Sequence, residues 1–416
     1  MLKCSFIECV KQERADINMK SKFKQIVKSE TLTGILLIFA TIISLIIANS
    51  NLGQTYHHLF SEVELFGHFN IHMIVNDFFM AIFFLLVGLE IKHEILHGHL
   101  SSLKKATFPI IAALGGVLVP AIIFTIFNHG TLFEHGIGVP ISTDIAFAIG
   151  IFMMLKSKMN PSLKIFLLSL AIVDDLISIL LIGILYSSNI NFEFLSLASA
   201  IMLVLILMNK KFKVNKVTPY MLIALVLWFC IYESGIHATI SGVLLALAIP
   251  TKVLKNEKES VSQKLEHKLN PLCNLFILPL FALVNTAISL SIDIDLASSN
   301  TLIVGIVLGL VIGKPLGIIL FTFIAAKLGI TEKPENATWV SIFSVSLLAG
   351  IGFTMAIFVA EIAFEATPEY ISIAKISILG ASILSIISTY IVATISSRVS
   401  THNMKISNNT ESESVA

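Results

Sequence analysis

The sequence predicts an all-α, polytopic membrane protein, and three observations lead to that prediction. Of the 416 residues, 56% are hydrophobic and only 13% are charged, whereas about a quarter of the residues in a soluble domain are charged. Apolar stretches long enough for transmembrane helices of roughly 20 residues recur along the chain. Lysine and arginine gather in every second connection between these stretches, as expected for a chain that crosses a membrane repeatedly.

Twelve apolar stretches are predicted to span the bilayer, with short polar breaks between them. Their approximate bounds are 32–48, 74–97, 106–127, 139–155, 161–186, 192–208, 217–234, 236–250, 271–290, 301–328, 339–364 and 370–396. The first 30 residues lack the continuous apolar region of a signal peptide. The chain therefore divides into an N-terminal tail (1–30), a transmembrane domain (31–398) and a C-terminal tail (399–416).

The basic residues also predict the orientation. Of the 28 lysines and arginines, 26 lie in the two tails and in the even-to-odd connections, while the opposite connections contain acids and no basic residue. Basic residues mark the cytoplasmic side, so both termini are predicted to face the cytoplasm. The net charge of +1 gives no basic field for nucleic acid, and the four scattered cysteines suggest no metal or cofactor site.

Two lysines fall inside the predicted spans. Lys375 lies near the outer end of the last span, where its side chain can extend to the membrane surface. Lys314 lies near the middle of span 301–328, where an ionised side chain costs several kcal/mol without a partner. Lys314 therefore predicts a functional site.

Intramembrane carboxylates supply the partners for that site. Asp174 and Asp175 lie together near the middle of span 161–186. Two adjacent carboxylates cannot easily both stay ionised in a low dielectric, so a proton or a cation must neutralise them. This chemistry suits the exchange of H⁺ for a hard cation such as Na⁺ or Li⁺, and the alternative is an Asp–Lys ion pair that only ties helices together. The second span carries further acids, namely Asp77 and Glu90 within it and Glu94 at its cytoplasmic end.

Two spans contain helix-weakening sequences. The stretch GVPISTDIAFAIG surrounds Asp144 in the fourth span, and LLAGIGFTMAIF lies in the middle of the eleventh. Interrupted spans in corresponding positions of two halves are typical of inverted-repeat transporters. In such a fold, Asp144 would offset the positive ends of facing half-helices and Lys314 the negative ends.

These motifs together resemble the bacterial NhaA-type Na⁺/H⁺ antiporters from about residue 30 to residue 396. The similar segments are VGLEIKHE, STDIAFAIG, KIFLLSLAIVDD, SGIHAT, LEHKLNP, IGKPLG and GIGFTM. This family is itself a known example of the inverted-repeat transporter folds. The resemblance implies twelve helices with two crossed discontinuous helices, IV and XI.

The resemblance also implies roles for particular residues. Asp175 and Asp174 would bind Na⁺ and carry protons, with Thr143 beside them, while Asp144 and Lys314 would compensate charge at the crossed helices. A cytoplasmic funnel that responds to pH would include Glu90, Glu94, His237, Glu266 and His267, and Asp77 matches an acidic position in the second helix. Family members form homodimers through a small extracellular hairpin, which would lie at about 61–72 here.

The chain departs from the family pattern at three points, and the first two bear on the pH response. His93 stands where the family pattern has an arginine, Asn270 stands where a second histidine follows the LEH motif, and the N-terminal tail is longer. The expected activity is therefore an electrogenic, pH-regulated exchange of cytoplasmic Na⁺ or Li⁺ for external H⁺ across the lipid bilayer. We expect no enzyme activity and no cofactor.

Other functions are weighed against this one. A Na⁺-coupled symporter of organic anions could share the broken helices, but it needs a roomier site than adjacent aspartates suggest. HEILH at 93–97 fits the H-E-x-x-H zinc motif, yet a metalloprotease would leave Asp174, Asp175 and Lys314 unexplained. An aspartyl intramembrane protease lacks a GxGD motif on a second helix, and a channel would release a tightly coordinated cation too slowly.

Overall fold

The computed structural model describes residues 30–66, 69–187, 190–253, 257–288, 299–335 and 337–415. The predicted N-terminal tail lies outside the described residues apart from Glu30, and of the predicted C-terminal tail only the backbone up to residue 415 is described. The helices and helical turns, in chain order, are α2 (Glu30–Ala48), α3 (Gly53–Ser61), α4 (Ile71–Met73), η1 (Ile74–Phe79), α5 (Met80–His97), η2 (His99–Ser101), α6 (Leu103–Asn128), η3 (Glu134–Ile141), α7 (Ile145–Met154), α8 (Ser162–Leu185), α9 (Phe192–Lys210), α10 (Val217–Glu233), α11 (Ile240–Ala248), α12 (Val261–Leu272), η4 (Cys273–Ile277), α13 (Leu278–Asn285), α14 (Asn300–Leu308), η5 (Gly309–Gly313), α15 (Lys314–Lys327), α16 (Trp339–Ala349), α17 (Phe353–Ala363) and α18 (Pro368–Val415).

These helices confirm a multi-pass, helical membrane protein. Within the described residues, nine helical segments are long and apolar enough to cross a bilayer, one of them made of η3 and α7 together. The pair α16 and α17, bent by 44° at its break, makes a tenth. The remaining two predicted spans correspond to α10, with 17 residues, and α11, with 9 residues. At 1.5 Å per residue these helices are about 26 Å and 14 Å long, shorter than a hydrocarbon core of about 30 Å. The number of twelve spans therefore stays a prediction.

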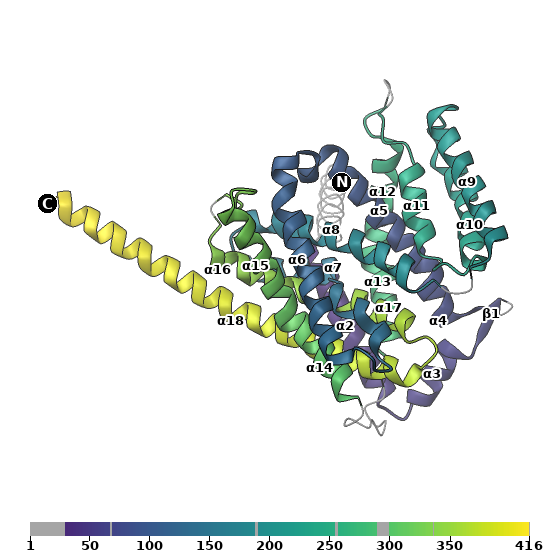
Figure 1. Ribbon diagram of the computed structural model, residues 1–416, viewed down its shortest axis with the longest axis horizontal. Helices are drawn as coiled ribbons and strands as arrows, with labels where there is room; N and C mark the ends of the chain where they lie inside the picture. The colour runs from purple at the N-terminus through teal and green to yellow at the C-terminus, as the bar shows by residue number, and fades with distance from the viewer. Residues whose placement is uncertain are drawn as a thin grey trace, which may run out of the picture.

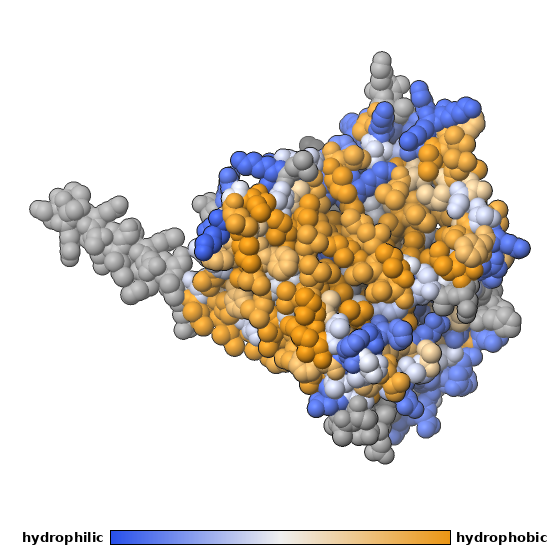
Figure 2. Space-filling view, in the orientation of Figure 1, coloured by the Kyte–Doolittle hydropathy of each residue, from blue (hydrophilic) through white to orange (hydrophobic). Residues whose placement is uncertain are grey.

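Two groups of helices lie on opposite sides of the centre of the molecule (Figure 1). The group that we call the α15 bundle contains α6, α14, α15, α16 and α18, and the group that we call the α11 bundle contains α5, α9, α10, α11 and α12. Between them lie α7, α8 and α17. The apolar side chains that face outward form a broad band between hydrophilic ends (Figure 2), as expected for a surface in contact with lipid.

Close backbone contact between α6 and α15 fixes one wall of the interior. A Cβ atom at Gly115 would lie 2.2 Å from the carbonyl oxygen of Gly317, and one at Gly317 would lie 2.0 Å from that of Gly115. Only glycine permits this approach, which small residues commonly provide between membrane helices. Lys314 lies one turn before Gly317, so the contact sets the position of its side chain.

A small hairpin follows the first span. Strand β1 (Glu64–Phe66) pairs antiparallel with β2 (Phe69–Asn70), within the region 61–72 where the family resemblance implies a hairpin. Asn70 then caps α4, because its side chain accepts a hydrogen bond from the Met73 amide at 2.8 Å. The hairpin thus leads directly into the second span.

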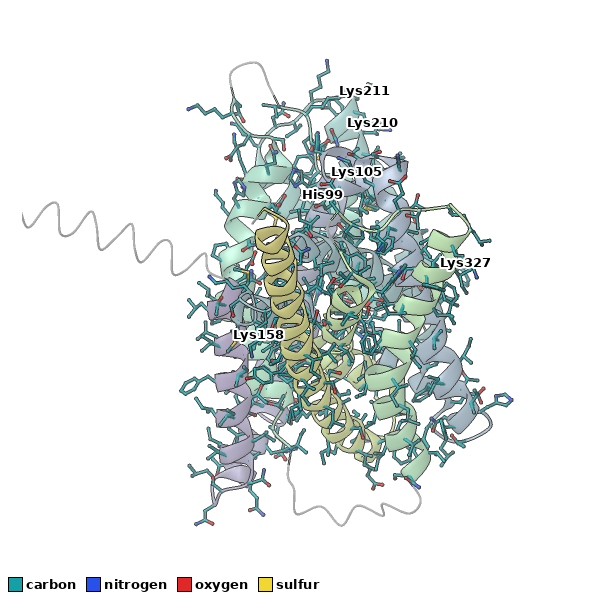
Figure 3. The ribbon with its side chains drawn as sticks, turned by 90° about the vertical axis from the view of Figure 1, so that its left-hand side faces the viewer. His99, Lys105, Lys158, Lys210, Lys211 and Lys327 are labelled. Carbon is teal, nitrogen blue, oxygen red and sulfur yellow. The ribbon has the colours of Figure 1, made fainter. Side chains whose placement is uncertain are left out.

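Basic side chains gather at one end of the molecule. Lys105, Lys210 and Lys211 lie together at the upper end in Figure 3. They belong to different connections of the chain, and all three belong to the set of basic residues that the sequence places on one side. The three-dimensional grouping therefore agrees with the alternation of charge along the sequence.

Candidate functional site

Two interrupted helices touch each other at their breaks. The chain is extended at 142–144 between η3 and α7, and residues 350–352 separate α16 from α17. The amide of Asp144 donates a hydrogen bond to the carbonyl oxygen of Ile351 at 2.8 Å. A Cβ atom at Gly350 would lie 2.5 Å from the carbonyl oxygen of Leu310, so glycine is needed for this close packing.

Asp144 satisfies the N-terminal ends of two helices. Its Oδ1 atom accepts a hydrogen bond from the Phe147 amide at 2.9 Å and caps α7. Its Oδ2 atom accepts from the Thr354 amide at 3.1 Å, in the first turn of α17, and from the Thr354 hydroxyl. Because helix N-termini carry partial positive charge and unpaired amides, one buried carboxylate stabilises both half-helices.

The C-terminal ends at the breaks have donors of their own. Lys314 Nζ donates to the carbonyl oxygen of Ile141, the last residue of η3. The hydroxyl of Thr143 donates to the carbonyl oxygen of Ala349, the last residue of α16, at 2.8 Å. The sequence predicted that Lys314 alone would offset the negative C-terminal ends of the half-helices. In the structure, Lys314 satisfies the end of η3 and Thr143 satisfies the end of α16.

The adjacent aspartates have different surroundings. Asp174 Oδ2 lies 2.7 Å from Lys314 Nζ, and both side chains are 1% exposed. Asp175 is equally buried, yet neither of its carboxylate oxygens has a hydrogen-bond partner among the described residues. Unpaired buried carboxylate oxygens are costly, so Asp175 requires a proton or a cation that the surrounding protein does not supply.

A cavity of about 130 Å³ reaches Asp144, at the break between η3 and α7. Its polar lining includes Glu30, Glu90, Asp144 and Asn270, which come from four different spans. Glu30 also pairs with Lys164 at 2.7 Å, at the end of the molecule where the basic residues are predicted. We call this cavity the inner cavity.

A second cavity, of about 360 Å³, lies on the other side, and we call it the outer cavity. Its polar lining includes His72, Asp77, His237, Glu361 and Glu365. The family resemblance grouped His237 with the cytoplasmic residues, whereas the structure places it here, with its ring 5.7 Å from that of Phe358. The reason is that His237 follows the C-terminal end of α10, the end that the alternation of basic residues in the sequence predicts to lie opposite the basic connections.

Buried aromatic rings separate the two cavities. Phe83 lines the inner cavity and Phe358 the outer one. Between them, Phe84 contacts Phe83 with ring centroids 5.6 Å apart and Phe358 with centroids 5.4 Å apart. Neither cavity therefore runs straight through the protein in this conformation.

The predicted pH-responsive residues are only partly brought together. Glu90 accepts a hydrogen bond from Asn270 at 3.4 Å, and His93 Nδ1 lies 4.0 Å from Glu266 Oε1. These two contacts join α5 to α12. Glu94 instead accepts a hydrogen bond from the His99 amide just after α5, at 2.6 Å.

His267 lies apart from the α5–α12 contacts. Its Nδ1 atom is 3.5 Å from Glu259, and the two side chains are 66% and 44% exposed. The rings of His93 and His97, which satisfy the zinc motif, are 5.7 Å apart. Within the residues that the structure describes, no group of three or more His, Cys, Asp or Glu side chains is arranged to hold a metal ion.

Two lysines have roles that were not apparent from the sequence. Lys375 does not extend to the membrane surface as predicted, because its ammonium group pairs with Glu361 and both side chains are 12% exposed. Lys92 donates to three carbonyl oxygens at the C-terminal end of α11, those of Ala246, Leu247 and Ile249, at 2.6–3.0 Å. The acid in the eleventh span, Glu361, was the signal that could have identified a partner for Lys375.

Comparisons with known proteins agree with this architecture. The family described as Na⁺/H⁺ antiporter 1 matches residues 24–393. The chain is 44% identical over 378 residues to the Na⁺/H⁺ antiporter NhaA 2 of Aliarcobacter butzleri, covering 88% of this chain and 94% of the relative. It is 46% identical over 361 residues to NhaA of Cytophaga hutchinsonii and 39% identical over 407 residues to NhaA of Helicobacter pylori, and each comparison covers 87% of this chain and 92% of the relative. The chain therefore belongs to the NhaA-type Na⁺/H⁺ antiporter family.

Proposed function

We propose that this protein exchanges cytoplasmic Na⁺, and also Li⁺, for external protons across the bacterial inner membrane. The buried Asp175 carboxylate beside the Asp174–Lys314 pair carries this proposal. A carboxylate whose two oxygens have no protein donor can bind either a proton or a hard cation, but not both at the same time. Competition for Asp175 would thus couple the two ions.

Asp174 and Lys314 would make the exchange electrogenic. When Na⁺ binds to Asp175 and Asp174, it competes with the Lys314 ammonium group for the Asp174 carboxylate, and the displaced lysine can release a proton. Two protons would then move inward for each Na⁺ that moves outward, so every cycle carries one net positive charge inward. The membrane potential would thereby help to drive sodium out of the cell.

The two cavities would provide alternating access. Na⁺ would enter through the inner cavity past Glu90 and Asp144, and protons would arrive through the outer cavity. Movement of the α15 bundle against the α11 bundle would open one side and close the other. Thr143, Asp144 and Lys314 would keep the ends of the crossed half-helices satisfied during this movement.

The remaining features of the family resemblance belong to the same proposal. The protein would have twelve spans, with α10 and α11 as the two shortest, and both termini would lie in the cytoplasm. The tails at 1–30 and 399–416 would lie outside the transmembrane domain, and the β1–β2 hairpin would join two copies into a homodimer. Asp77 would belong to the outer access route rather than to the ion site.

A symporter of Na⁺ and an organic anion is not favoured. The relatives named above are called antiporters, and the positive charge nearest to the aspartates, Lys314, already has Asp174 as its partner. An organic anion would need a cation that is free to receive it. Solute uptake would become the next assay only if Na⁺ fails to move protons.

Everted membrane vesicles that contain the protein test the exchange directly. After the vesicles are acidified inside, addition of Na⁺ or Li⁺ should release protons, which a ΔpH-sensitive dye records between pH 6 and 9. Choline chloride at equal ionic strength serves as the control. The proposal is wrong if neither cation changes the dye signal at any pH while the protein is present in the membrane.

The contact between His93 and Glu266 predicts a shift in the pH profile. Histidine is the side chain whose charge changes between pH 5 and 8, whereas arginine stays charged. We expect His93→Arg to strengthen the contact between α5 and α12 above the pH at which histidine loses its charge, and so to move the activation midpoint to higher pH. Maximal exchange should be kept, because Asp174, Asp175 and Lys314 are unchanged. His97→Arg, at an exposed position one turn later on α5, is the matched control, and an identical profile for His93→Arg and wild type would remove His93 from the pH response.

A further inference from the structure

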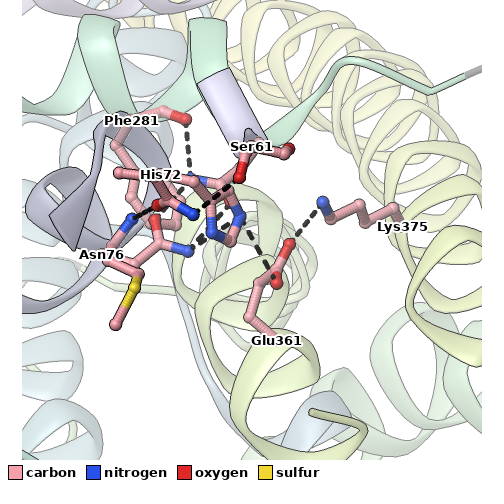
Figure 4. A network of polar contacts seen from close by, with 9 residues as sticks. Ser61, His72, Asn76, Phe281, Glu361 and Lys375 are labelled. Atoms are coloured by element: carbon pink, nitrogen blue, oxygen red, sulfur yellow. Dashed lines mark hydrogen bonds and ion pairs between the residues drawn. The ribbon is translucent and has the colours of Figure 1, made fainter. Parts of the chain in front are cut away.

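A buried ionic cluster crosses the outer cavity, away from the aspartate site. Glu361 on α17 lies against the ammonium group of Lys375 on α18 and the imidazole ring of His72 on α4 (Figure 4). The His72 Nε2 atom lies 3.6 Å from Glu361 Oε2. The side chains of Glu361 and Lys375 are 12% exposed and that of His72 is 30% exposed, so this cluster is more sheltered than an ordinary surface ion pair.

The Nε2 atom of His72 that faces Glu361 also contacts a chain of amides. The Asn76 amide group lies 3.2 Å from His72 Nε2, and Asn285 donates to Asn76 Oδ1 at 2.7 Å. Asn285 also donates to the carbonyl oxygen of Phe281 at 3.1 Å. One continuous polar path therefore links α18 and α17 to α4, η1 and α13 (Figure 4).

This path joins parts of the molecule that the antiport cycle would move apart. Lys375 belongs to α18 in the α15 bundle, while His72 and Asn76 begin the span that continues as α5 in the α11 bundle. The contact between His72 and Glu361 closes the gap between them. Both residues line the outer cavity, so their separation would widen it.

Glu361 is also rigidly connected to the ion site. It lies seven residues after Thr354, which is two helical turns, or about 10.5 Å, along the same face of α17. Thr354 donates to Asp144 through both its amide and its hydroxyl. Any displacement of α17 that changes the site is therefore transmitted to Glu361.

The geometry points to an outer latch: we propose that Glu361, held in place by Lys375, binds His72 to keep the outer cavity closed, and that this contact must break before the cavity can reach the aspartates. The latch rests on the proposed antiport cycle. Lys375 supplies a fixed charge, because Glu361 would otherwise be an uncompensated buried carboxylate. His72 is the partner that can move away, because its side chain is 30% exposed whereas that of Glu361 is 12% exposed.

Acidic side chains outnumber basic ones around position 72. Asp77 lies on its own span, Glu361 and Glu365 come from the end of α17 and the residues after it, and Lys375 comes from α18. Asn285 from α13 adds no charge. A fixed positive charge at position 72 should therefore tighten the latch, and a neutral side chain should loosen it.

Thiol labelling measures the opening of the latch. Ala238 lines the outer cavity and is 2% exposed, so a cysteine at this position reports how readily the cavity opens. The four native cysteines are replaced by serine, Ala238→Cys is introduced, and a membrane-impermeant maleimide is added from the outer face of right-side-out vesicles. We expect His72→Gln to label at least fivefold faster than the His72 parent and His72→Lys to label at least twofold slower.

Two further variants keep the test decisive. Glu361→Gln combined with Lys375→Met removes the ionic contact without leaving a buried charge unpaired, and it should label as fast as His72→Gln. Glu365→Gln removes an acid from the same cavity, four residues after Glu361, and should stay within twofold of the parent. Equal labelling of the parent, His72→Gln and the double variant, or a shift in the same direction for Gln and Lys at position 72, would overturn the latch.

Labelling also separates this inference from the proposed function. The labelling reaction needs no ion gradient, so it reports the outer cavity even in a protein that does not transport Na⁺. If the variants differ in labelling as expected but Na⁺ drives no proton movement, the antiport proposal is wrong while the role of the His72–Glu361 contact is supported. In an active antiporter, His72→Gln should also lower the half-saturating concentration of Na⁺ on the outer face at least twofold, since opening of the cavity then costs less.

Discussion

Replacement of Asp175 by asparagine is expected to abolish exchange. The side chain keeps its shape but loses the charge that Na⁺ and H⁺ compete for, and Asp175 has no other protein partner among the described residues. We expect Na⁺-driven proton flux to fall by at least about 100-fold, because loss of an ionised ligand in a water-poor site costs several kcal/mol and each 1.4 kcal/mol is a factor of ten. The flux is measured in everted vesicles at matched protein levels.

Ser178→Ala is the matched control for this substitution. Ser178 lies one turn after Asp175 on α8, is 3% exposed, and contacts the hydroxyl of Ser142 at 3.5 Å. It shares the buried surroundings but carries no charge, so the variant should keep at least half of the flux. Appreciable Na⁺-dependent proton movement in Asp175→Asn would refute the role of this carboxylate.

Replacement of Lys314 by methionine is expected to destabilise the folded protein strongly. Methionine fills a similar volume, but it leaves the buried Asp174 carboxylate and the Ile141 carbonyl oxygen without their donor. Removal of one partner of a buried ion pair costs about 3–5 kcal/mol. A melting curve of the purified protein in detergent measures the loss as a lower midpoint.

The double variant Asp174→Asn/Lys314→Met should recover most of that stability, because no unpaired charge then remains buried. Lys327→Met, at the exposed end of the same helix α15, should leave the midpoint unchanged. If Lys314→Met melts at the same temperature as the wild-type protein, the contact with Asp174 does not contribute to the stability of the folded state. If the double variant is no more stable than Lys314→Met, the lysine acts through the Ile141 carbonyl oxygen instead.

Much of the site could be predicted from the sequence because charges within apolar stretches are conspicuous. The sequence placed Asp174, Asp175 and Lys314 near the middle of their spans, and the structure puts Asp174 in direct contact with Lys314. It also located the weak points of two spans, which proved to be where Asp144 meets Ile351 and Thr354. Their roles in transport stay predictions.

Residue partners across the bundle could not be predicted in the same way. Lys375 was expected at the membrane surface and is instead paired with Glu361, and His237 was grouped with Glu90 but lines a different cavity. Thr143 was expected beside the ion site, and in the structure it also satisfies the end of α16. Each of these outcomes depends on which helices are neighbours and on how each helix is rotated.

The sequence by itself determined that this chain crosses a membrane many times, which end is basic, and which charged residues must find partners inside. These properties follow from the local cost of placing apolar or charged groups in water or lipid. Only the tertiary structure decided that Asp144 caps two helices at once, that Lys314 pairs with Asp174 while Asp175 stays unpartnered, and that Glu361 joins Lys375 to His72. Such pairings arise from packing between segments far apart in the chain, where close approaches such as Gly115 to Gly317 set which side chains can meet.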